Sequence, residues 1–405
     1  MIADRMNMTN SRKFISIVTE TYAPEVNGVV NTLLNLCKGL IDAGHRVQLI
    51  KPRHNSGNET CVDQPLEVLD VKGLPIPGYK DLKFGLPARA KLAKLWQYER
   101  PDAIYVATEG PLCWSAVGIA RFFNIPVISG FHTNFHTYSK YYRLGVLQKV
   151  ITQYLKIFHN RTQLTLVPTS DMRDLLENMS IDNGAVWSRG VNAELYHPQK
   201  RCHKLRAQWG VKNNEFAVLY VGRLAAEKNI QLALTSFYRM QALNPSLKFV
   251  MVGHGPLLDE LKLKHQDIIF AGVKNGEELA KYYASGDILL FPSETETFGN
   301  VITEAMASGL AVVAYDYAAA RVHIHHGCNG IVATKGDESE FVYQCMQLVQ
   351  DSEKQLIMRE NARATSEKIS WETIVNQFLM YINSVQRHKV TYEHKQSQSD
   401  VQLSR

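Results

Sequence analysis

The 405-residue sequence has no long run of apolar residues. Met1 to Arg12 are polar and of mixed charge, so the start of the chain lacks the hydrophobic segment that a signal peptide needs. No later stretch reaches the roughly 18 consecutive apolar residues of a membrane-spanning helix. We therefore expect a protein that stays in the cytoplasm.

Paired cysteines are also absent: the six cysteines are scattered along the chain and form no C-x-x-C motif. Structural zinc sites and disulfide frameworks depend on closely spaced or paired cysteines, so this spacing argues against both. We expect the cysteines to be small buried hydrophobic residues.

Acidic residues are missing between Glu109 and Asp171. Cations and tyrosines are frequent there instead: Arg121, Lys140, Arg143, Lys149, Lys156, Arg161, Tyr138, Tyr141, Tyr142 and Tyr154. We predict that residues 111–170 dock on an anionic membrane surface. Lipid phosphates would meet Lys140, Arg143 and Lys149, and the headgroup region would receive Tyr138, Tyr141, Tyr142, Leu144, Val146 and Leu147. The alternative is a solvated helix face that happens to lack carboxylates.

The rest of the composition is typical of a globular protein, with 45% hydrophobic and 21% charged residues. A chain of this length exceeds one ordinary core and indicates two domains. Alternating β-rich and helical patterns favour an α/β fold with two Rossmann-like domains, at 13–196 and 197–370. A helix at 371–387 should pack back on the first domain, and a disordered tail should follow at 388–405.

Five short β-rich runs are recognisable in each half. In the first half they are Phe14 to Val18, Arg46 to Ile50, Ala103 to Ala107, Val127 to Gly130 and Leu164 to Pro168. In the second half they are Ala217 to Val221, Lys248 to Val252, Ile268 to Ala271, Ile288 to Phe291 and Ala311 to Ala314. The chain between them is long enough for crossover helices, so we expect parallel sheets covered on both faces. In such sheets, ligands bind in the loops that follow the carboxyl ends of the strands.

The loop after the first strand of the second half carries two cations, Arg223 and Lys228, and leads into a helix. A guanidinium and an ammonium beside a helix N-terminus form a clamp for an anion. The alternative is a pair of surface cations near a turn.

A second strand-end loop carries two glutamates, Glu296 and Glu304. We predict that Asn300 caps a short helix ending at Gly309, with free amides at residues 299–302. Carboxylates at these positions can accept hydrogen bonds from sugar or ribose hydroxyls, while the amides bind phosphate oxygens. Alternatively, both glutamates interact only with the helix dipole.

Several separated motifs resemble those of retaining glycosyltransferase family 4, which has the GT-B fold. The second half contains G-R-L-x-x-x-K-N, then V-G-x-G-P, then E-T-F-G-N-V-x-x-E-A-M-A-x-G, in this order. The first half contains T-Y-A-P-E-V-N-G-V at 21–29 and G-F-H-T-N-F at 130–135. The resemblance extends from Phe14 to about Val385. It implies two Rossmann-like domains that face each other across a cleft.

The resemblance also implies roles for residues of the second half. Arg223 and Lys228 match the pair that neutralises the donor diphosphate. Glu296 matches the catalytic-site glutamate that orients the transferred sugar, and Glu304 matches the one that binds the ribose. The backbone that touches sugar and phosphate in the family corresponds to Phe298, Gly299, Asn300 and Val301.

In the first half, Gly28 matches the glycine whose missing side chain lets a loop approach the diphosphate. His132 matches the catalytic histidine near the reacting sugar. The chain departs from the family at 318–323, where a glycine-rich or proline-containing loop with a glutamate is usual. That departure, the single glycine of the first loop and the segments at 131–135 and 188–192 look most like bacterial members that use GDP-mannose to mannosylate glycolipids.

No D-x-D motif is positioned for a divalent ion, which favours a transferase without a metal or other cofactor. The co-substrate would be the nucleotide-diphosphate sugar itself. The family's same-face displacement, in which the departing phosphate takes the acceptor proton, would explain why no carboxylate base for the acceptor is recognisable.

Five other functions are alternatives to this one. A nicotinamide oxidoreductase is disfavoured because Gly253-His254-Gly255 lacks the third glycine of G-x-G-x-x-G. A transferase of the same fold that uses UDP-glucose or UDP-N-acetylglucosamine and a GT-B sugar-nucleotide epimerase both stay open. A sugar-nucleotide-binding scaffold would not need the clamp and Glu296. Nucleic-acid binding is unlikely without a recognition motif.

Overall fold

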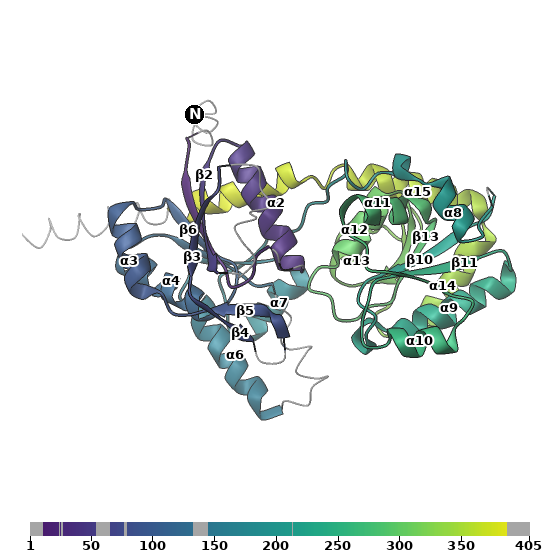
Figure 1. Cartoon of the computed structure of the whole chain (residues 1–405), viewed down its shortest axis with the longest axis horizontal. Coiled ribbons are helices and arrows are strands. Elements are labelled where there is room, and N and C mark those ends of the chain that lie inside the picture. The colour runs from purple at the N-terminus through teal and green to yellow at the C-terminus, as the bar shows by residue number, and fades with distance from the viewer. Residues whose placement is uncertain are drawn as a thin grey trace, which may run out of the picture. The chain divides into compact units, whose positions relative to one another are not determined.

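The computed structural model describes residues 11–23, 25, 27–53, 65–76, 79–132, 145–212 and 214–386 (Figure 1). The chain divides into two compact units: unit 1 comprises Met1–Ser188 and Trp371–Arg405, and unit 2 comprises Arg189–Ser370. Residues 189–196, which the sequence assigned to the first domain, therefore lie in unit 2. Val191 pairs there with Ser370, and the Tyr196 ring packs on Tyr283.

Unit 1 is built on a parallel sheet of seven strands in the order β3-β2-β1-β6-β7-β8-β9. These strands are β1 (Phe14–Val18), β2 (Arg46–Pro52), β3 (Glu67–Val71), β6 (Ala103–Val106), β7 (Val127–Gly130), β8 (Leu164–Val167) and β9 (Gly184–Val186). A separate antiparallel pair consists of β4 (Gly73–Ile76) and β5 (Tyr79–Gly85). All strands of the large sheet end at the same edge because they are parallel.

Helices cover both faces of this sheet. Helix α2 (Gly28–Asp42) and the helix at 371–386 pack on one face, and α3 (Arg89–Tyr98), α4 (Pro111–Phe122) and part of α6 (Gly145–His159) pack on the other. In Figure 1 the C-terminal helix (yellow) runs beside α2, where Gly39 leaves no room for a side chain against Val375. Helix α7 (Ser170–Asn178) packs with α6 in a smaller cluster. The predicted return of the C-terminal helix to the first domain thus agrees with the packing, while residues 388–405 lie outside the described part.

Unit 2 is built on a parallel sheet of six strands in the order β12-β11-β10-β13-β14-β15. The strands are β10 (Ala217–Val221), β11 (Lys248–Val252), β12 (Ile269–Gly272), β13 (Ile288–Phe291), β14 (Ala311–Tyr315) and β15 (Ile331–Ala333). The helices are α8 (His203–Gln208), α9 (Ile230–Leu243), α10 (Leu258–Lys264), α11 (Gly276–Ser285), α12 (Asn300–Ala307), α13 (Ala318–His323), α14 (Glu338–Gln350) and α15 (Ser352–Ser366), with short 3-10 turns η1 (Pro198–Lys200) and η2 (Ala226–Lys228). Two buried clusters, one on each face of the sheet, confirm the predicted covered sheet.

A buried carboxylate ties the start of unit 2 to its end. Asp287 accepts hydrogen bonds from Arg201 at 2.8 Å and Arg206 at 2.8 Å, and Arg359 of α15 lies at 2.9 Å. Burial alone would raise the pKa of Asp287, but the surrounding guanidinium groups lower it below its usual value. The chain before β10 and helix α15 are thereby held to the loop that enters β13.

The strand orders place one reversal point in each sheet. In unit 1 it lies between β1 and β6, and in unit 2 between β10 and β13. The loops that follow such strand pairs diverge to opposite faces and leave a crevice in which ligands bind. Among the described residues, no helix is both long and apolar enough to cross a membrane.

Candidate functional site

The loop after β10 is held by close contact between backbones. The Leu224 amide donates to the His254 carbonyl at 3.0 Å, and the Leu257 amide donates to the Leu224 carbonyl at 3.0 Å. A Cβ at Gly253 or Gly255 would collide with the backbone of this loop. The G-x-G pattern therefore serves the packing of two loops, which positions the segment that carries Arg223.

The two predicted clamp cations lie in this loop but in different surroundings. Lys228 is at the end of η2, and its ammonium group forms an ion pair with the Glu296 carboxylate from the loop after β13. The Arg223 side chain is 53% exposed, and its Nη1 lies 3.5 Å from Glu227. The fold thus brings Lys228 and Glu296, 68 residues apart in sequence, into direct contact at the reversal point of the sheet.

Helix α12 begins beside this ion pair. Its N-cap is Gly299, with a left-handed backbone at φ +91°, so the prediction of an Asn300 cap is wrong by one residue. Only glycine adopts that conformation at little cost, and no side chain caps the helix. The Ile302 amide already donates to the Gly299 carbonyl at 3.0 Å, so the free amides predicted at 299–302 are reduced to 299–301 within the described structure. The helix ends at Ala307 with Ser308 as its C-cap, directly before Gly309.

Glu304 lies inside α12 and is held by tyrosines. The Tyr283 hydroxyl donates to Glu304 Oε2 at 3.0 Å, and the Tyr196 hydroxyl also interacts with the carboxylate. Burial raises the pKa of Glu304 to about 7, although both hydroxyl contacts act in the opposite direction. A carboxylate so placed can gain hydrogen bonds from hydroxyl groups of a ligand, and it would bind them best in its ionised form.

The loop after β14 is fastened to the same turn. The Ala319 amide donates to the Phe298 carbonyl at 2.8 Å, and the Phe298 ring packs edge-on against His323. Phe298 itself is buried, and Val301 lies half-buried on the same cluster. Ala318 has φ +52°, a left-handed conformation that favours glycine. Residues 318–323 lack the glycines that are usual in the family, but Ala318 still has a left-handed backbone of the kind that glycine favours.

The two predicted residues of unit 1 follow β1 and β7. His132 is buried, and its Nε2 lies 2.7 Å from the Tyr105 hydroxyl. A side chain at Gly130 would collide with both groups. Gly28 is the first residue of α2, and a Cβ there would meet nothing within 4 Å. The fold of unit 1 does not itself require glycine at that position.

Sequence reasoning missed a buried glutamate at the reversal point of unit 1. The Glu20 carboxylate accepts hydrogen bonds from the Leu112 amide at 2.9 Å and the Cys113 amide at 3.3 Å, both at the start of α4, and from the Gly85 amide. Burial raises the pKa of Glu20 to about 7, against the effect of these amides. Its position directly after a buried strand was the available signal. The start of α4 is thus occupied by a side chain of the protein, whereas the start of α12 is not capped by one.

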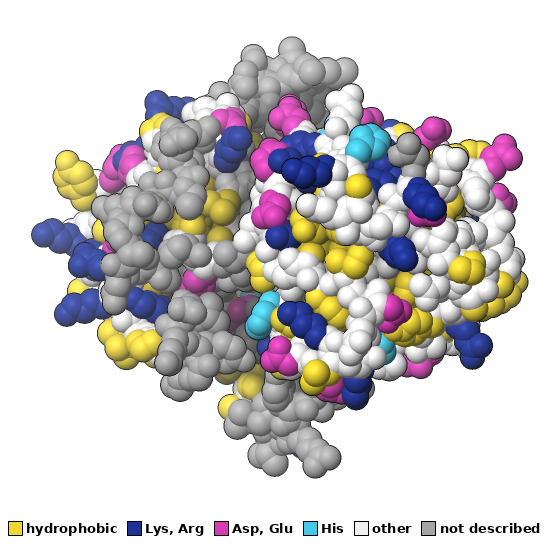
Figure 2. All heavy atoms as spheres, turned by 45° about the vertical axis from the view of Figure 1, so that its right-hand side comes forward, with side chains coloured by type: hydrophobic (Ala, Val, Ile, Leu, Met, Phe, Trp, Pro, Cys, Tyr) yellow, Lys and Arg dark blue, Asp and Glu magenta, His cyan; other side chains and the backbone are white. Residues whose placement is uncertain are grey.

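The predicted membrane segment is only partly described. Residues 133–144 lie outside the described part of the chain, as do the side chains at 145–148. On α6, Lys149, Val150, Tyr154 and Ile157 are exposed and Lys156 is half-buried. Lys and Arg side chains (dark blue) also gather at the left-hand edge of Figure 2, the side on which α3 lies in Figure 1.

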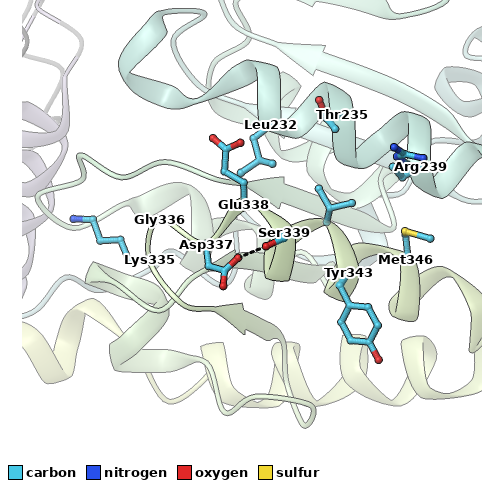
Figure 3. A pocket seen from close by; sticks show the side chains of 11 residues that line it. Leu232, Thr235, Arg239, Lys335, Gly336, Asp337, Glu338, Ser339, Tyr343 and Met346 are labelled. Atoms are coloured by element: carbon cyan, nitrogen blue, oxygen red, sulfur yellow. Dashed lines mark hydrogen bonds between the residues drawn. The ribbon is translucent and has the colours of Figure 1, made fainter.

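A hollow of about 980 Å³ lies elsewhere, between α9 and α14 (Figure 3). Asp337 caps α14 there and accepts a hydrogen bond from the Ser339 hydroxyl at 2.6 Å. The hollow shares no residue with the predicted site. The described residues also contain no group of three or more His, Cys, Asp or Glu side chains arranged to hold a metal ion.

Two family models match this chain. The model of "Glycosyl transferases group 1" matches residues 203–365, and that of "Glycosyltransferase Family 4" matches residues 26–195. The two matches fall on the two halves of the sequence.

Individual proteins are similar over most of the chain. A GDP-mannose-dependent alpha-mannosyltransferase of Corynebacterium glutamicum is 31% identical, covering 92% of this chain and 89% of the relative. An alpha-monoglucosyldiacylglycerol synthase of Streptococcus pneumoniae is 29% identical, covering 74% of this chain and 70% of the relative. The crystal structure of Anabaena HepE in complex with UDP superposes with a TM-score of 0.73 and 22% identity, covering 91% of this chain and 99% of that one. This structural likeness shows the fold.

Proposed function

We propose, from the premise that this chain belongs to the glycosyltransferases of group 1 and family 4, that it is a retaining enzyme which needs no metal ion. It moves a hexose from a nucleotide-diphosphate sugar, with GDP-mannose favoured, to a hydroxyl group of a lipid-linked or glycan acceptor. The observation that carries this proposal is the contact between Lys228 and Glu296 beside the uncapped start of α12. A cation, a carboxylate and backbone amides meet there at the carboxyl edge of the unit 2 sheet.

This group of residues suits the charges of glycosyl transfer. Cleavage of the bond between the sugar and the diphosphate leaves negative charge on the departing phosphate. Lys228, the exposed Arg223 and the amides at 299–301 are placed to stabilise that charge, which is the task a metal ion performs elsewhere. Glu296 then orients the sugar, and Glu304 accepts hydrogen bonds from the ribose. The acceptor oxygen attacks from the same face, and its proton passes to the departing phosphate oxygen.

Unit 1 contributes the acceptor side of this reaction. His132, held by Tyr105, is the proposed catalytic histidine, and Gly28 is the proposed glycine of the diphosphate loop. The start of α4 is not available to a donor phosphate, because the Glu20 carboxylate already accepts hydrogen bonds from its amides. Among the described residues, this difference favours the start of α12, in unit 2, for the donor phosphate.

GDP-mannose is favoured as donor because the Corynebacterium relative is named for it. Thermal-shift measurements with GDP-mannose, UDP-glucose, UDP-N-acetylglucosamine and the free diphosphates test this choice, since a ligand that binds only the native state raises its stability. The largest shift should come from GDP-mannose. A larger shift with a UDP-sugar would instead favour the alternative function, a UDP-sugar-dependent transferase of the same fold.

The acceptor is proposed to be lipid-linked, with the enzyme on the cytoplasmic face of the membrane. The Streptococcus relative is named for a diacylglycerol glycolipid. On α6, Val150, Tyr154 and Ile157 are exposed at helical spacing, Lys149 is exposed next to Val150, and Arg161 is exposed just after the helix. Side chains of this kind can enter the headgroup region of an anionic bilayer while the cations meet lipid phosphates.

Transfer of labelled mannose from GDP-mannose to a membrane lipid extract, in excess EDTA, tests the reaction itself. We expect a labelled lipid to form, with the anomeric configuration of the donor. Loss of activity that only magnesium or manganese restores would refute metal independence. A changed nucleotide sugar without any labelled acceptor would favour the alternative, a sugar-nucleotide epimerase of the same fold.

A further inference from the structure

A cavity of about 520 Å³ in unit 1 has a strongly basic wall. It lies where β2 and β3 end and α3 begins, and we call it the basic pocket after its four cations, Arg53, Lys72, Arg89 and Lys91. Because the sheet is parallel, it opens at the same edge as the loops that carry Gly28 and His132. None of its residues belongs to the site described above.

The charges of this pocket are poorly compensated within the protein. Asp70 is the one carboxylate in its wall, and Lys51 already lies 3.3 Å from it. Lys91 donates to the Asp70 carbonyl at 2.7 Å. Within the described part of the chain, Arg53, Lys72 and Arg89 have no ion pair through their side chains. Like charges around one cavity repel each other, and a bound anion reduces this repulsion. The pocket should therefore bind a negatively charged ligand.

The backbone at the start of α3 adds donors to the same wall. The N-cap is Ala88, which offers no side-chain hydrogen bond to the helix. Its own amide donates to the Ser115 hydroxyl at 3.2 Å, which fixes this end of the helix against α4. The first residues of α3, from Ala88 to Lys91, line the pocket, so the amides at this end of the helix border it. Uncompensated guanidinium groups and free amides together suit phosphate oxygens.

The size and remaining wall of the pocket limit the ligand further. Val71, Leu86 and Pro87 supply apolar surface beside the cations. A volume of this size is within the range of about 300–1,000 Å³ found for small-molecule sites. It exceeds the needs of a bare phosphate ion and suits a phosphate joined to a small organic group.

We propose that the basic pocket binds the phosphate of a glycerol-sized phosphoester, and that this group belongs to the acceptor or to the lipid surface that presents it. The second half of the statement rests on the proposed function; phosphate binding itself does not. Arg53 and Lys72 reach the phosphate from the strand ends, and Arg89 from the helix. The pocket thereby holds the acceptor end of the reaction at the edge of the sheet where His132 lies.

Binding by the full-length chain tests this proposal without any donor sugar. Vesicles of phosphatidylcholine with and without phosphatidylglycerol are compared in a flotation assay, and soluble glycerol phosphate is titrated calorimetrically. The triple variant Arg53→Gln, Lys72→Gln, Arg89→Gln is measured beside a matched control, Lys204→Gln, Lys262→Gln, Lys281→Gln, which removes the same charge from exposed sites of unit 2.

We expect the pocket variant to bind phosphatidylglycerol vesicles about tenfold more weakly than the control variant, or weaker still. Competition by glycerol phosphate would identify the phosphoester as the recognised group, and binding of vesicles alone would assign it to lipid. Equal binding by the two triple variants, to vesicles and to glycerol phosphate, would overturn the proposal. If the pocket variant gives the same thermal shift with GDP-mannose as the unchanged protein, the variant is folded. Weaker vesicle binding then reports on the basic pocket and not on the proposed donor site.

Discussion

At the scale of single residues, the ion pair between Lys228 and Glu296 invites the most direct test. We expect Lys228→Ala or Arg223→Ala to lower turnover about tenfold to a hundredfold, because each would remove a proposed charge-assisted contact with the diphosphate, of roughly 1.5–3 kcal/mol. Steady-state kinetics with the nucleotide sugar measure this, with Lys281→Ala as an exposed control on α11. Near-normal kinetics in both clamp variants would remove the diphosphate assignment.

Glu304 should make donor binding depend on pH. Its pKa of about 7 means that the carboxyl is largely protonated at pH 6 and ionised at pH 8. Ribose hydroxyls donate to the ionised form, so donor affinity should rise with pH, by up to about tenfold per unit below the pKa. Calorimetry between pH 6 and 8 measures this affinity. The intact nucleotide sugar is used because a free nucleoside diphosphate has a terminal phosphate that would itself titrate in this range.

The matched variant for this measurement is Glu304→Gln. It keeps an acceptor oxygen near Tyr283 but cannot ionise. Its affinity should be lower and flat over the same pH range. A pH dependence that persists in the glutamine variant would show that another group is responsible.

Tyr105 is expected to position His132. Tyr105→Phe keeps the ring contacts with Trp187 and Phe378 but removes the hydroxyl that lies 2.7 Å from His132 Nε2. We expect kcat to fall severalfold and its pH profile to change, with little change in KM for the donor, whose proposed site is in unit 2. Tyr238→Phe is the control because it removes a tyrosine–histidine hydrogen bond of 2.8 Å, together with one to Asp267, among residues that are not part of the candidate site. An identical effect of both substitutions would reduce Tyr105 to a structural role.

At the scale of elements, the start of α13 stores backbone strain. Ala318 has φ +52°, which costs an alanine roughly 1–2 kcal/mol more than a glycine. Ala318→Gly should therefore raise the free energy of unfolding, by less than about 1 kcal/mol after the greater entropy loss of glycine. Ala319→Gly, one residue later inside the helix, should lower it by about 1 kcal/mol. Chemical denaturation of both variants checks the opposite signs, and a loss of stability in both would contradict the strain.

At the scale of the whole molecule, the C-terminal helix makes unit 1 depend on residues that follow unit 2 in sequence. Phe378 is completely buried and packs on Tyr105 and Trp187. Phe378→Ala should destabilise unit 1 by about 3–5 kcal/mol, while unit 2 keeps its own two clusters. Hydrogen exchange should show faster exchange confined to unit 1, and Met380→Ala, exposed on the same helix, should show none. Faster exchange spread over unit 2 would mean that the units do not unfold separately.

The sequence by itself determined the fold class and the order of the site motifs. Strands such as Ala217–Val221 and Lys248–Val252 were predicted with their observed bounds, because buried strands of a parallel sheet are short, continuous and rich in β-branched residues. The strands β3, β9 and β15 were missed. Each lies at an edge of its sheet and pairs with one neighbour, and β3 and β9 lack the fully buried apolar run of a central strand.

The tertiary structure decided which of the predicted groups meet and in what state. Only folding brings Lys228 to Glu296, buries Glu304 until its pKa rises to about 7, and sets the Tyr105 hydroxyl on His132. Folding also gathers the four cations of the basic pocket, which come from the ends of β2 and β3 and from α3, around a cavity with few neighbouring carboxylates. Local sequence determines backbone preference and amphipathic pattern, but contacts, burial and ionisation arise from residues far apart in the chain, and these are fixed only when the sheets and their loops pack together.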